Sequence, residues 1–403
     1  MVCLIRNMIV TWLLTASIAS AALTVELGGN GIERQGAIAT VALPSECDDW
    51  TDVVAASADG VLVPAQISSG TPRQLFLVVD RLRANEHLRV EVRQRDDQSA
   101  ELQPSRVRVI DQDGSFRVFV GDQMVLQYNH AMIESPPGLD PIYRRSGHIH
   151  PLFTPSGRLV TDDFCPTDHT HQHGVMFAWT NCSFEGRKVN FWEQKNRQAV
   201  VRHSATRSVV AGPVFAELKT TIDHIDTTSG KEIPVLSEDW RVRVYNVTDR
   251  FVFDLRSSQR CVADSPLTVN QYHYGGMAIR GRRDWTARNS GFLTSNGKVR
   301  DGGNHDRPNW CDMSGRVDDG VGGVTLYCHP GNFRAPQSVR LHPSMPYFCY
   351  APLVLGDFQI SADKPFVSNY RFVTHDSEVD TTTANRLWAD YAHPITASIV
   401  PSP

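Results

Sequence analysis

Residues 143–192 read YRRSGHIHPLFTPSGRLVTDDFCPTDHTHQHGVMFAWTNCSFEGRKVNFW, and this stretch holds five of the fifteen histidines of the chain. The five lie within 26 residues, as His148 and His150 and then as His169, His171 and His173. The glycines, prolines and β-branched residues around them favour strand and loop over helix. Because alternate side chains of a strand share one face, we expect each group of histidines to project to one side. The stretch therefore predicts a β-rich fold with histidines on a strand face.

Three aspartates, Asp162, Asp163 and Asp168, lie among these histidines. Imidazole titrates near neutral pH and is the commonest metal ligand, so a cluster of histidines and carboxylates suits proton transfer or metal binding. On a helix only His169 and His173 would meet. A histidine-rich surface loop, or a set of hydrogen-bonded core histidines, is the alternative interpretation of the same pattern.

Outward from this stretch, apolar runs typical of strands continue from Val107 to the last part of the chain. They include RVRVID, SFRVFVGD, VFAELKTTIDHI, DWRVRVYN, FVFDLRSS and FVSNYRFVTHD. Many antiparallel strands of different lengths fit an expanded sandwich better than a barrel, which predicts an all-β, two-sheet supersandwich over residues 106–398. Thr381 to Tyr391 is the one segment that resembles a helix, with threonines at its start as caps.

The N-terminal part of the chain differs from this large unit. Residues 22–105 contain shorter strand-like runs such as IATVALP and QLFLVVD, which predict a small β-sandwich domain that ends in the polar stretch 95–105. Residues 1–21 combine Arg6, an apolar run and Ala19-Ser20-Ala21, the pattern of a secretory signal peptide. We therefore expect cleavage near Ala21 and a periplasmic or extracellular protein.

Composition argues against several classes of protein. The net charge of −4 and the lack of a long basic block do not favour nucleic-acid binding. After residue 21 no stretch approaches the roughly 20 apolar residues of a membrane span. The sequence has no G-x-G-x-x-G, P-loop or G-x-S-x-G motif, so nucleotide binding and α/β-hydrolase chemistry are not expected. Seven cysteines after residue 21, without a C-x-x-C pair, leave one or two disulfides and their pairing open, and the oligomeric state is open too.

Several motifs follow one another along the chain: YRRSGHIHPLFTPSGRLVTDDF, DHTHQHG, FAWT, QYHYGG, WCDMSG, HPSMPYFCYAP and DYAHP. Over residues 116–394 they resemble a bacterial family catalogued as PmoA-like. The resemblance implies a core similar to the galactose-mutarotase supersandwich, a fold class that includes sugar epimerases, polysaccharide lyases and glycosidases. Methane oxidation, which the family label suggests, is not expected, because a particulate methane monooxygenase subunit is an integral membrane protein and this chain has no span after residue 21.

The residues and the resemblance predict a secreted carbohydrate-active protein. The first hypothesis is an enzyme that acts on a sugar or polysaccharide fragment by acid–base chemistry, as an epimerase, lyase or glycoside-cleaving enzyme. The second hypothesis is a non-catalytic carbohydrate-binding or cell-surface protein, in which histidines and aromatic residues only form a platform. Composition does not separate the two hypotheses, and neither requires a cofactor.

Candidate catalytic residues are histidines and the groups that can assist them. His171 or His173 is the expected general base, and His273 with Tyr274 is the expected acid or substrate clamp. Asp312, in WCDMSG, is the candidate to orient a histidine through its second ring nitrogen. Arginines are expected to hold an anionic sugar, because a guanidinium matches a carboxylate or sulfate. The candidate substrate-binding residues are Arg144, Arg145, His148, His150, Asp163, Trp179 and Arg280.

A catalytic divalent metal ion is a further hypothesis for the histidine cluster. Same-face neighbours on a strand are about 6.5–7 Å apart, whereas two ligands of one zinc ion are about 3.3 Å apart. Three alternate residues of one strand therefore rarely converge on one ion. A combination of both segments fits better, so the candidate ligands are His148, His171 and His173.

Overall fold

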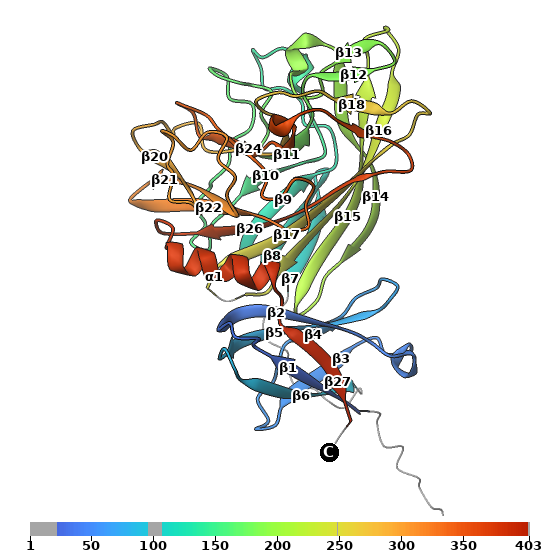
Figure 1. The fold of residues 1–403 in the computed structure, drawn as a ribbon, viewed down its shortest axis with the longest axis vertical. Coiled ribbons are helices and arrows are strands. Elements are labelled where there is room, and N and C mark those ends of the chain that lie inside the picture. Colours follow the sequence, from blue (N-terminus) through green and yellow to red (C-terminus); the bar gives the residue numbers. More distant parts are fainter. Residues whose placement is uncertain (1–21, 96–106, 248, 402–403) are drawn as a thin grey trace, which may run out of the picture.

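The computed structural model describes residues 22–95, 107–247 and 249–401. The predicted signal peptide, residues 1–21, and most of the predicted boundary at 95–105 lie outside these residues. Strands dominate the described residues, among which α1 (Thr381–Ala392) is the one α-helix. Figure 1 shows a large unit above a smaller one, with α1 near their junction. The predicted all-β fold class is confirmed.

The small unit consists of two antiparallel sheets, ordered β27-β1-β6-β3 and β2-β5-β4. Their strands are β1 (Ala22–Gly28), β2 (Arg34–Ala42), β3 (Val53–Ser57), β4 (Ala65–Ile67), β5 (Gln74–Leu82), β6 (His87–Gln94) and β27 (Thr396–Val400). The inward side chains, among them Trp50, Leu77 and Val90, form an apolar core separate from that of the large unit. The small unit is thus a sandwich with its own core.

The last described strand returns to the first. β27 pairs with β1, from Thr24 opposite Val400 to Gly28 opposite Thr396, and Figure 1 shows this red strand among the blue ones. The division of the chain at residues 22–105 and 106–398 remains a prediction. The small sandwich nevertheless includes β27, from the far end of the chain, as an edge strand. The sequence of a five-residue segment does not show which sheet the segment will join.

The large unit contains two eight-stranded antiparallel sheets within the described residues, as predicted for a supersandwich. The first has the order β23-β24-β19-β11-β10-β9-β8-β7. Its strands are β7 (Val107–Gln112), β8 (Ser115–Val120), β9 (Gln123–Asn129), β10 (His148–Leu152), β11 (Val175–Ala178), β19 (Gly276–Arg280), β23 (Val339–Leu341) and β24 (Tyr347–Tyr350).

The second large sheet has the order β14-β15-β16-β17-β26-β22-β21-β20. Its strands are β14 (Ala199–Val210), β15 (Phe215–Asp226), β16 (Ile233–Tyr245), β17 (Phe251–Cys261), β20 (Ser290–Thr294), β21 (Trp310–Val317), β22 (Gly320–Cys328) and β26 (Phe366–His375). A smaller sheet, ordered β13-β12-β18-β25, comprises β12 (Cys182–Phe184), β13 (Arg187–Val189), β18 (Leu267–Val269) and β25 (Phe358–Ile360).

The core of the large unit follows from strand alternation. In β26, Phe366, Ser368, Tyr370 and Phe372 are buried while Val367, Asn369 and Arg371 between them are partly exposed, the period-2 pattern of a half-buried strand. The ring of Phe372 stacks on Phe253 of β17 with 4.5 Å between centroids. Burial of each large apolar side chain stabilises the fold by about 1.5–3 kcal/mol. Both large sheets contribute to this one apolar cluster.

The predicted helix is present as α1, but its cap differs from the prediction. The side chain of Asp380, not a threonine, accepts hydrogen bonds from the backbone N–H groups of Thr382 and Thr383. Leu387 of α1 packs in an apolar cluster with Phe76 of the small unit and Tyr245 of the large unit. The helix therefore helps to join the two units.

Each of the seven cysteines in the described residues is a free, buried thiol. The disulfides that the sequence left open are thus not formed among them. Burial raises the pKa of Cys182, Cys311 and Cys349, so these thiols behave as small apolar side chains. Within the described part of the chain, no helix is long and apolar enough to cross a membrane.

Candidate functional site

Three of the clustered histidines lie in an irregular segment, residues 153–174, between β10 and β11, which we call the histidine loop. It contains turns, bends and isolated bridges but no strand. The strand predicted across His169, His171 and His173 is therefore wrong. Alternation does not place these three side chains on one face.

Two backbone positions explain why the histidine loop turns. His169 has a φ of 46°, in the left-handed region that strands do not use. Gly174 also has a φ of 46°, and a Cβ atom there would lie 2.1 Å from the backbone oxygen of Ile149, so only glycine fits against β10. Between them, the Gln172 N–H group donates to the backbone oxygen of His169 at 2.9 Å, which closes a turn, and His171 and His173 face different carboxylates.

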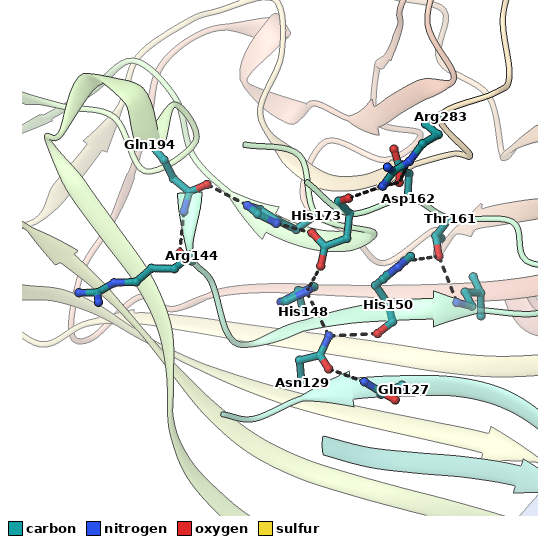
Figure 2. A network of polar contacts seen from close by, with 12 residues as sticks. Gln127, Asn129, Arg144, His148, His150, Thr161, Asp162, His173, Gln194 and Arg283 are labelled. Carbon is teal, nitrogen blue, oxygen red and sulfur yellow. Dashed lines mark hydrogen bonds and ion pairs between the residues drawn. The ribbon is translucent and has the colours of Figure 1, made fainter. Parts of the chain in front are cut away.

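His148, Asp163 and His173 form a buried group, which we call the inner cluster (Figure 2). The carboxylate of Asp163 lies between the two rings, with Oδ2 3.0 Å from His148 Nε2 and Oδ1 2.5 Å from His173 Nδ1. Both histidine side chains are 0% exposed and that of Asp163 is 8% exposed. The carboxylate therefore contacts both rings in a place almost closed to water.

Gln194, at the start of the short 3-10 helix Gln194–Asn196, holds the far side of His173 (Figure 2). Its Oε1 lies 2.8 Å from His173 Nε2, and its Nε2 donates to the backbone oxygen of Arg144 at 3.0 Å. The second bond fixes which end of the amide faces the ring. Both ring nitrogens of His173 thus face an acceptor, Asp163 at Nδ1 and Gln194 at Nε2.

Asn129 of β9 approaches the other histidine of the inner cluster. Its Nδ2 lies 3.1 Å from His148 Nε2 and donates to the backbone oxygen of His150 at 3.0 Å, and its Oδ1 accepts from Gln127. The orientation of this amide is therefore fixed as well. His148 Nε2 meets an N–H group of Asn129 and an oxygen of Asp163 at once. One nitrogen of a neutral imidazole either donates or accepts, so it cannot satisfy both neighbours.

The charges of the inner cluster follow from burial and from the short contacts. Burial lowers the pKa of His148 to about 4, although Asp163 favours the charged ring, so His148 is neutral at pH 7. Burial also opposes ionisation of Asp163, but His148 and His173 outweigh it and lower the pKa of this carboxyl group. Nδ1 of His148 has no hydrogen-bond partner among the described residues.

Among the described residues, the inner cluster is also the group that could hold a metal ion. One donor atom from each of its three residues lies within 4.8 Å of the other two. Two imidazole nitrogens and a carboxylate oxygen suit zinc and related divalent ions. Of the predicted ligands, the structure brings His148 and His173 together. Asp163 takes the place of His171, which turns toward another carboxylate.

His171, Glu193 and Tyr274 form a second group nearer the surface, which we call the outer cluster. The Tyr274 hydroxyl donates to Glu193 Oε1 at 3.0 Å, and the same oxygen lies 3.5 Å from His171 Nε2. The amine of Lys195 lies 3.2 Å from Glu193 Oε2. The Glu193 side chain is 13% exposed and that of Lys195 is 60% exposed. The Glu193 side chain is therefore partly exposed, although its Oε2 atom is buried.

The three groups of the outer cluster differ in protonation. Burial lowers the pKa of His171 to about 4, against the attraction of Glu193. Burial opposes ionisation of Glu193, but His171, Lys195 and Tyr274 outweigh it and lower its pKa. Burial and the neighbouring carboxylate raise the pKa of Tyr274. At neutral pH the outer cluster thus combines a carboxylate, a neutral imidazole and a phenol, which can accept and donate protons.

Aromatic rings surround Tyr274. The rings of Trp192, Tyr272 and His273 lie 5.4, 5.0 and 4.8 Å from its ring, measured between centroids. Tyr272 is 36% exposed, so an aromatic side chain beside the outer cluster reaches the surface. The predicted residue His273 therefore adjoins the outer cluster, on the solvent side of Tyr274.

The three predicted arginines have different surroundings. Arg145 is buried, and burial lowers its pKa to about 10, although Glu238 and Asp163 favour the charged form. Arg280 is buried too and donates to Gln172 Oε1 at 3.2 Å within the histidine loop. The side chain of Arg144 is exposed and lines a pocket of about 380 Å³ together with Gln194. Of the three, Arg144 is the one open to a ligand in this structure.

Three other predicted residues lie outside both clusters. The His150 ring contacts Thr161 Oγ1 at 3.0 Å and so ties β10 to the histidine loop. Trp179 is fully buried, and its Nε1–H group donates to Gln259 in the core. A ligand at the surface therefore does not contact Trp179 in this structure. Asp312 does orient a histidine, but this is His375, with 2.7 Å between Asp312 Oδ2 and His375 Nε2. Both residues belong to the second large sheet.

Glu193, Gln194 and Asn129 are absent from the residues predicted from the sequence. The first two directly follow Phe191 and Trp192, which end the histidine-rich stretch. An acid and an amide just after that stretch are the signal that could have indicated them. Asn129 has no comparable signal, because only the pairing of β9 with β10 brings it opposite His148.

No curated protein matches this sequence. Among solved structures, an α-mannosidase from Enterococcus faecalis is similar with a TM-score of 0.45 and 11% identity. The matched region covers 94% of this chain and 46% of the mannosidase chain. A glycosyl hydrolase family 38 protein from the same organism has a TM-score of 0.43, 10% identity and coverages of 94% and 47%. A galactose mutarotase related enzyme from Lactobacillus acidophilus has a TM-score of 0.29, 10% identity and coverages of 68% and 98%. The chain thus spans less than half the length of the first two proteins.

One family model matches residues 115–389, a range that includes both clusters. Its description is a family of unknown function, DUF6807, and it carries no statement about methane oxidation. Because the match covers well over half of the chain, the protein belongs to the DUF6807 family.

Proposed function

We propose that the protein is an acid–base enzyme that acts on a carbohydrate, with the outer cluster as its catalytic site. The observation that carries this proposal is the contact of Glu193 Oε1 with both the Tyr274 hydroxyl and His171 Nε2, at 3.0 and 3.5 Å. Catalytic proton transfer needs a donor and an acceptor within such reach of one another and of the substrate. The partly exposed carboxylate meets that requirement.

In this proposal Glu193 is the base that removes a proton from the bound sugar. Tyr274 is the acid, because its hydroxyl keeps its proton at neutral pH and can deliver it to an oxygen of the substrate. His171, whose buried Nε2 lies 3.5 Å from Glu193 Oε1, positions the base. Proton transfer of this kind is common to epimerases, lyases and glycoside-cleaving enzymes.

The substrate class is proposed from the surroundings of the outer cluster. An exposed aromatic ring beside charged groups suits a polyhydroxylated ring, which has apolar faces and polar edges. Tyr272 provides that ring, and Lys195 provides a nearby positive charge for an acidic sugar. We further propose that the protein acts outside the cytoplasm after cleavage near Ala21, which the N-terminal sequence of the secreted protein tests.

The direct test is incubation of the purified protein with a panel of neutral and uronate-containing glycans, followed by measurement of reducing ends, unsaturated products and anomeric or epimeric change. The proposal expects turnover of at least one class of glycan. A calorimetric titration with the same glycans accompanies the assay. Saturable binding without any turnover contradicts the enzymatic proposal and supports a non-catalytic sugar-binding protein instead.

A further inference from the structure

We propose that the inner cluster binds one divalent transition-metal ion of the zinc type, through His148 Nε2, the Asp163 carboxylate and His173 Nδ1. This inference concerns different side chains from those of the proposed catalytic site. It stands whether or not the outer cluster performs catalysis.

The three donor atoms converge in space. The three donors come from two segments, β10 and the histidine loop, and meet at one buried point. The contacts from Asp163 to His148 and His173, 3.0 and 2.5 Å, are already close to the roughly 3.3 Å between two ligands of one zinc ion. Small movements of the side chains are enough to admit an ion.

The surroundings of His173 also suit a metal ligand. A histidine that binds a metal through one nitrogen usually donates its other ring N–H to a fixed acceptor. Gln194 Oε1 is such an acceptor at 2.8 Å, and its orientation is fixed by the bond from Gln194 Nε2 to the backbone oxygen of Arg144. The ring of His173 is therefore held with Nδ1 directed at Asp163, as a metal ligand requires.

The number of protons that the inner cluster needs without an ion also favours a cation. His173 faces acceptors at both nitrogens in a site with 0% exposure, whereas a neutral imidazole has only one N–H group to donate. A cation at Nδ1 takes the place of a proton there and leaves a neutral ring that donates to Gln194. At His148, the cation takes the Nε2 lone pair beside the Asp163 carboxylate, and the amide of Asn129 keeps its hydrogen bond to the backbone oxygen of His150.

The role of the ion follows from its position. It would link β10 to the end of the histidine loop, next to the turn that directs His171 to the outer cluster. Burial of all three ligands suits an ion that stabilises this loop. The competing description is a metal-free cluster, in which a doubly protonated His173 pairs with Asp163.

The test uses Asp163→Asn and a matched control, Asp162→Asn. Asp162 is the adjacent buried carboxylate, but it pairs with Arg283 at 2.7 Å and not with the two histidines. The full chain is purified without a histidine tag, stripped with chelator, and titrated with ZnCl2, MnCl2 and CoCl2. Bound metal is measured by elemental analysis, and thermal unfolding is followed with and without each ion.

We expect wild type and Asp162→Asn to bind about one equivalent of at least one ion with a higher Tm, and Asp163→Asn to bind at least 10-fold more weakly. Bound Co2+ in wild type should show the visible absorption of a histidine-ligated site, a readout that does not depend on folding of any variant. Less than a tenth of an equivalent in folded wild type overturns the proposal in favour of the metal-free cluster. Equal binding by Asp162→Asn and Asp163→Asn also overturns it, because the ions then bind elsewhere.

Discussion

The inner and outer clusters contain the same residue types in different surroundings. Each contains a carboxylate beside a histidine whose pKa burial lowers to about 4, His148 in one and His171 in the other. Asp163 lies between two fully buried rings, whereas Glu193 is partly exposed and has a hydroxyl, an amine and an imidazole around it. We therefore base the two proposed roles, stability for the inner cluster and chemistry for the outer one, on the surroundings of each carboxylate and not on histidine density.

The largest expected effect is on catalysis in the outer cluster. Glu193→Gln keeps the shape of the side chain but removes the proposed base, so we expect turnover to fall by about 10²- to 10⁴-fold. Lys188→Gln, at an exposed lysine of β13 outside both clusters, is the control and should keep the rate of wild type. The rates are measured on the best glycan of the panel. Undiminished turnover in Glu193→Gln would place the chemistry elsewhere.

The inner cluster should respond in stability. Asp163→Asn removes the one carboxylate between two buried rings, and loss of one partner of a buried charge pair costs about 3–5 kcal/mol. The free energy of unfolding is measured in urea with chelator present, so that no bound ion contributes. A loss below about 1 kcal/mol would show that the two rings do not depend on this carboxylate.

A smaller loss of stability is expected at Gln194. Gln194→Leu leaves the Nε2–H group of His173 buried without an acceptor, which costs about 1–3 kcal/mol. Turnover at the outer cluster should change less than in Glu193→Gln, although Glu193 is the preceding residue. A variant as stable as wild type in urea would show that Gln194 does not hold the ring.

The smallest expected effect concerns His375, which belongs to neither cluster. Burial lowers its pKa, but Asp312 and the backbone oxygen of Ser377 outweigh burial and raise it above the ordinary value of 6.5. A raised folded pKa gives stability that is fully present below pH 6.5 and is lost as the pH rises through the folded pKa. His375→Gln should remove this pH dependence and about 1 kcal/mol below pH 6.5. Urea unfolding of both proteins at several pH values above and below 6.5 provides the check, and parallel pH profiles would contradict it.

The fold was predictable because strand alternation is local. The runs in β16, β17 and β26 alternate in sequence as they do in burial, and α1 is the one described segment with a helical pattern. The pairing of β27 with β1 was not predictable, because it joins residues more than 360 positions apart. The sequence of a short strand does not indicate which sheet the strand will join.

The candidate site was predictable in part for the same reason. Residue types identified His148, His171 and His173, but their partners depend on turns and on strand pairing. The turn over residues 169–172, closed by the bond from the Gln172 N–H group to the backbone oxygen of His169, replaces the alternating strand that would have kept His171 and His173 on one face. Asp312 contacts His375 because β22 pairs with both β21 and β26, a long-range arrangement that spacing does not show.

The most direct test of the division between the clusters is urea unfolding of His171→Gln and His173→Gln, measured side by side. The two residues are two positions apart in one loop and are both buried. We predict a loss of about 3 kcal/mol or more for His173→Gln, which breaks a buried charged pair, and about 1 kcal/mol or less for His171→Gln. Equal losses, or a larger loss for His171→Gln, would contradict the assignment of the inner cluster to stability and of the outer cluster to chemistry.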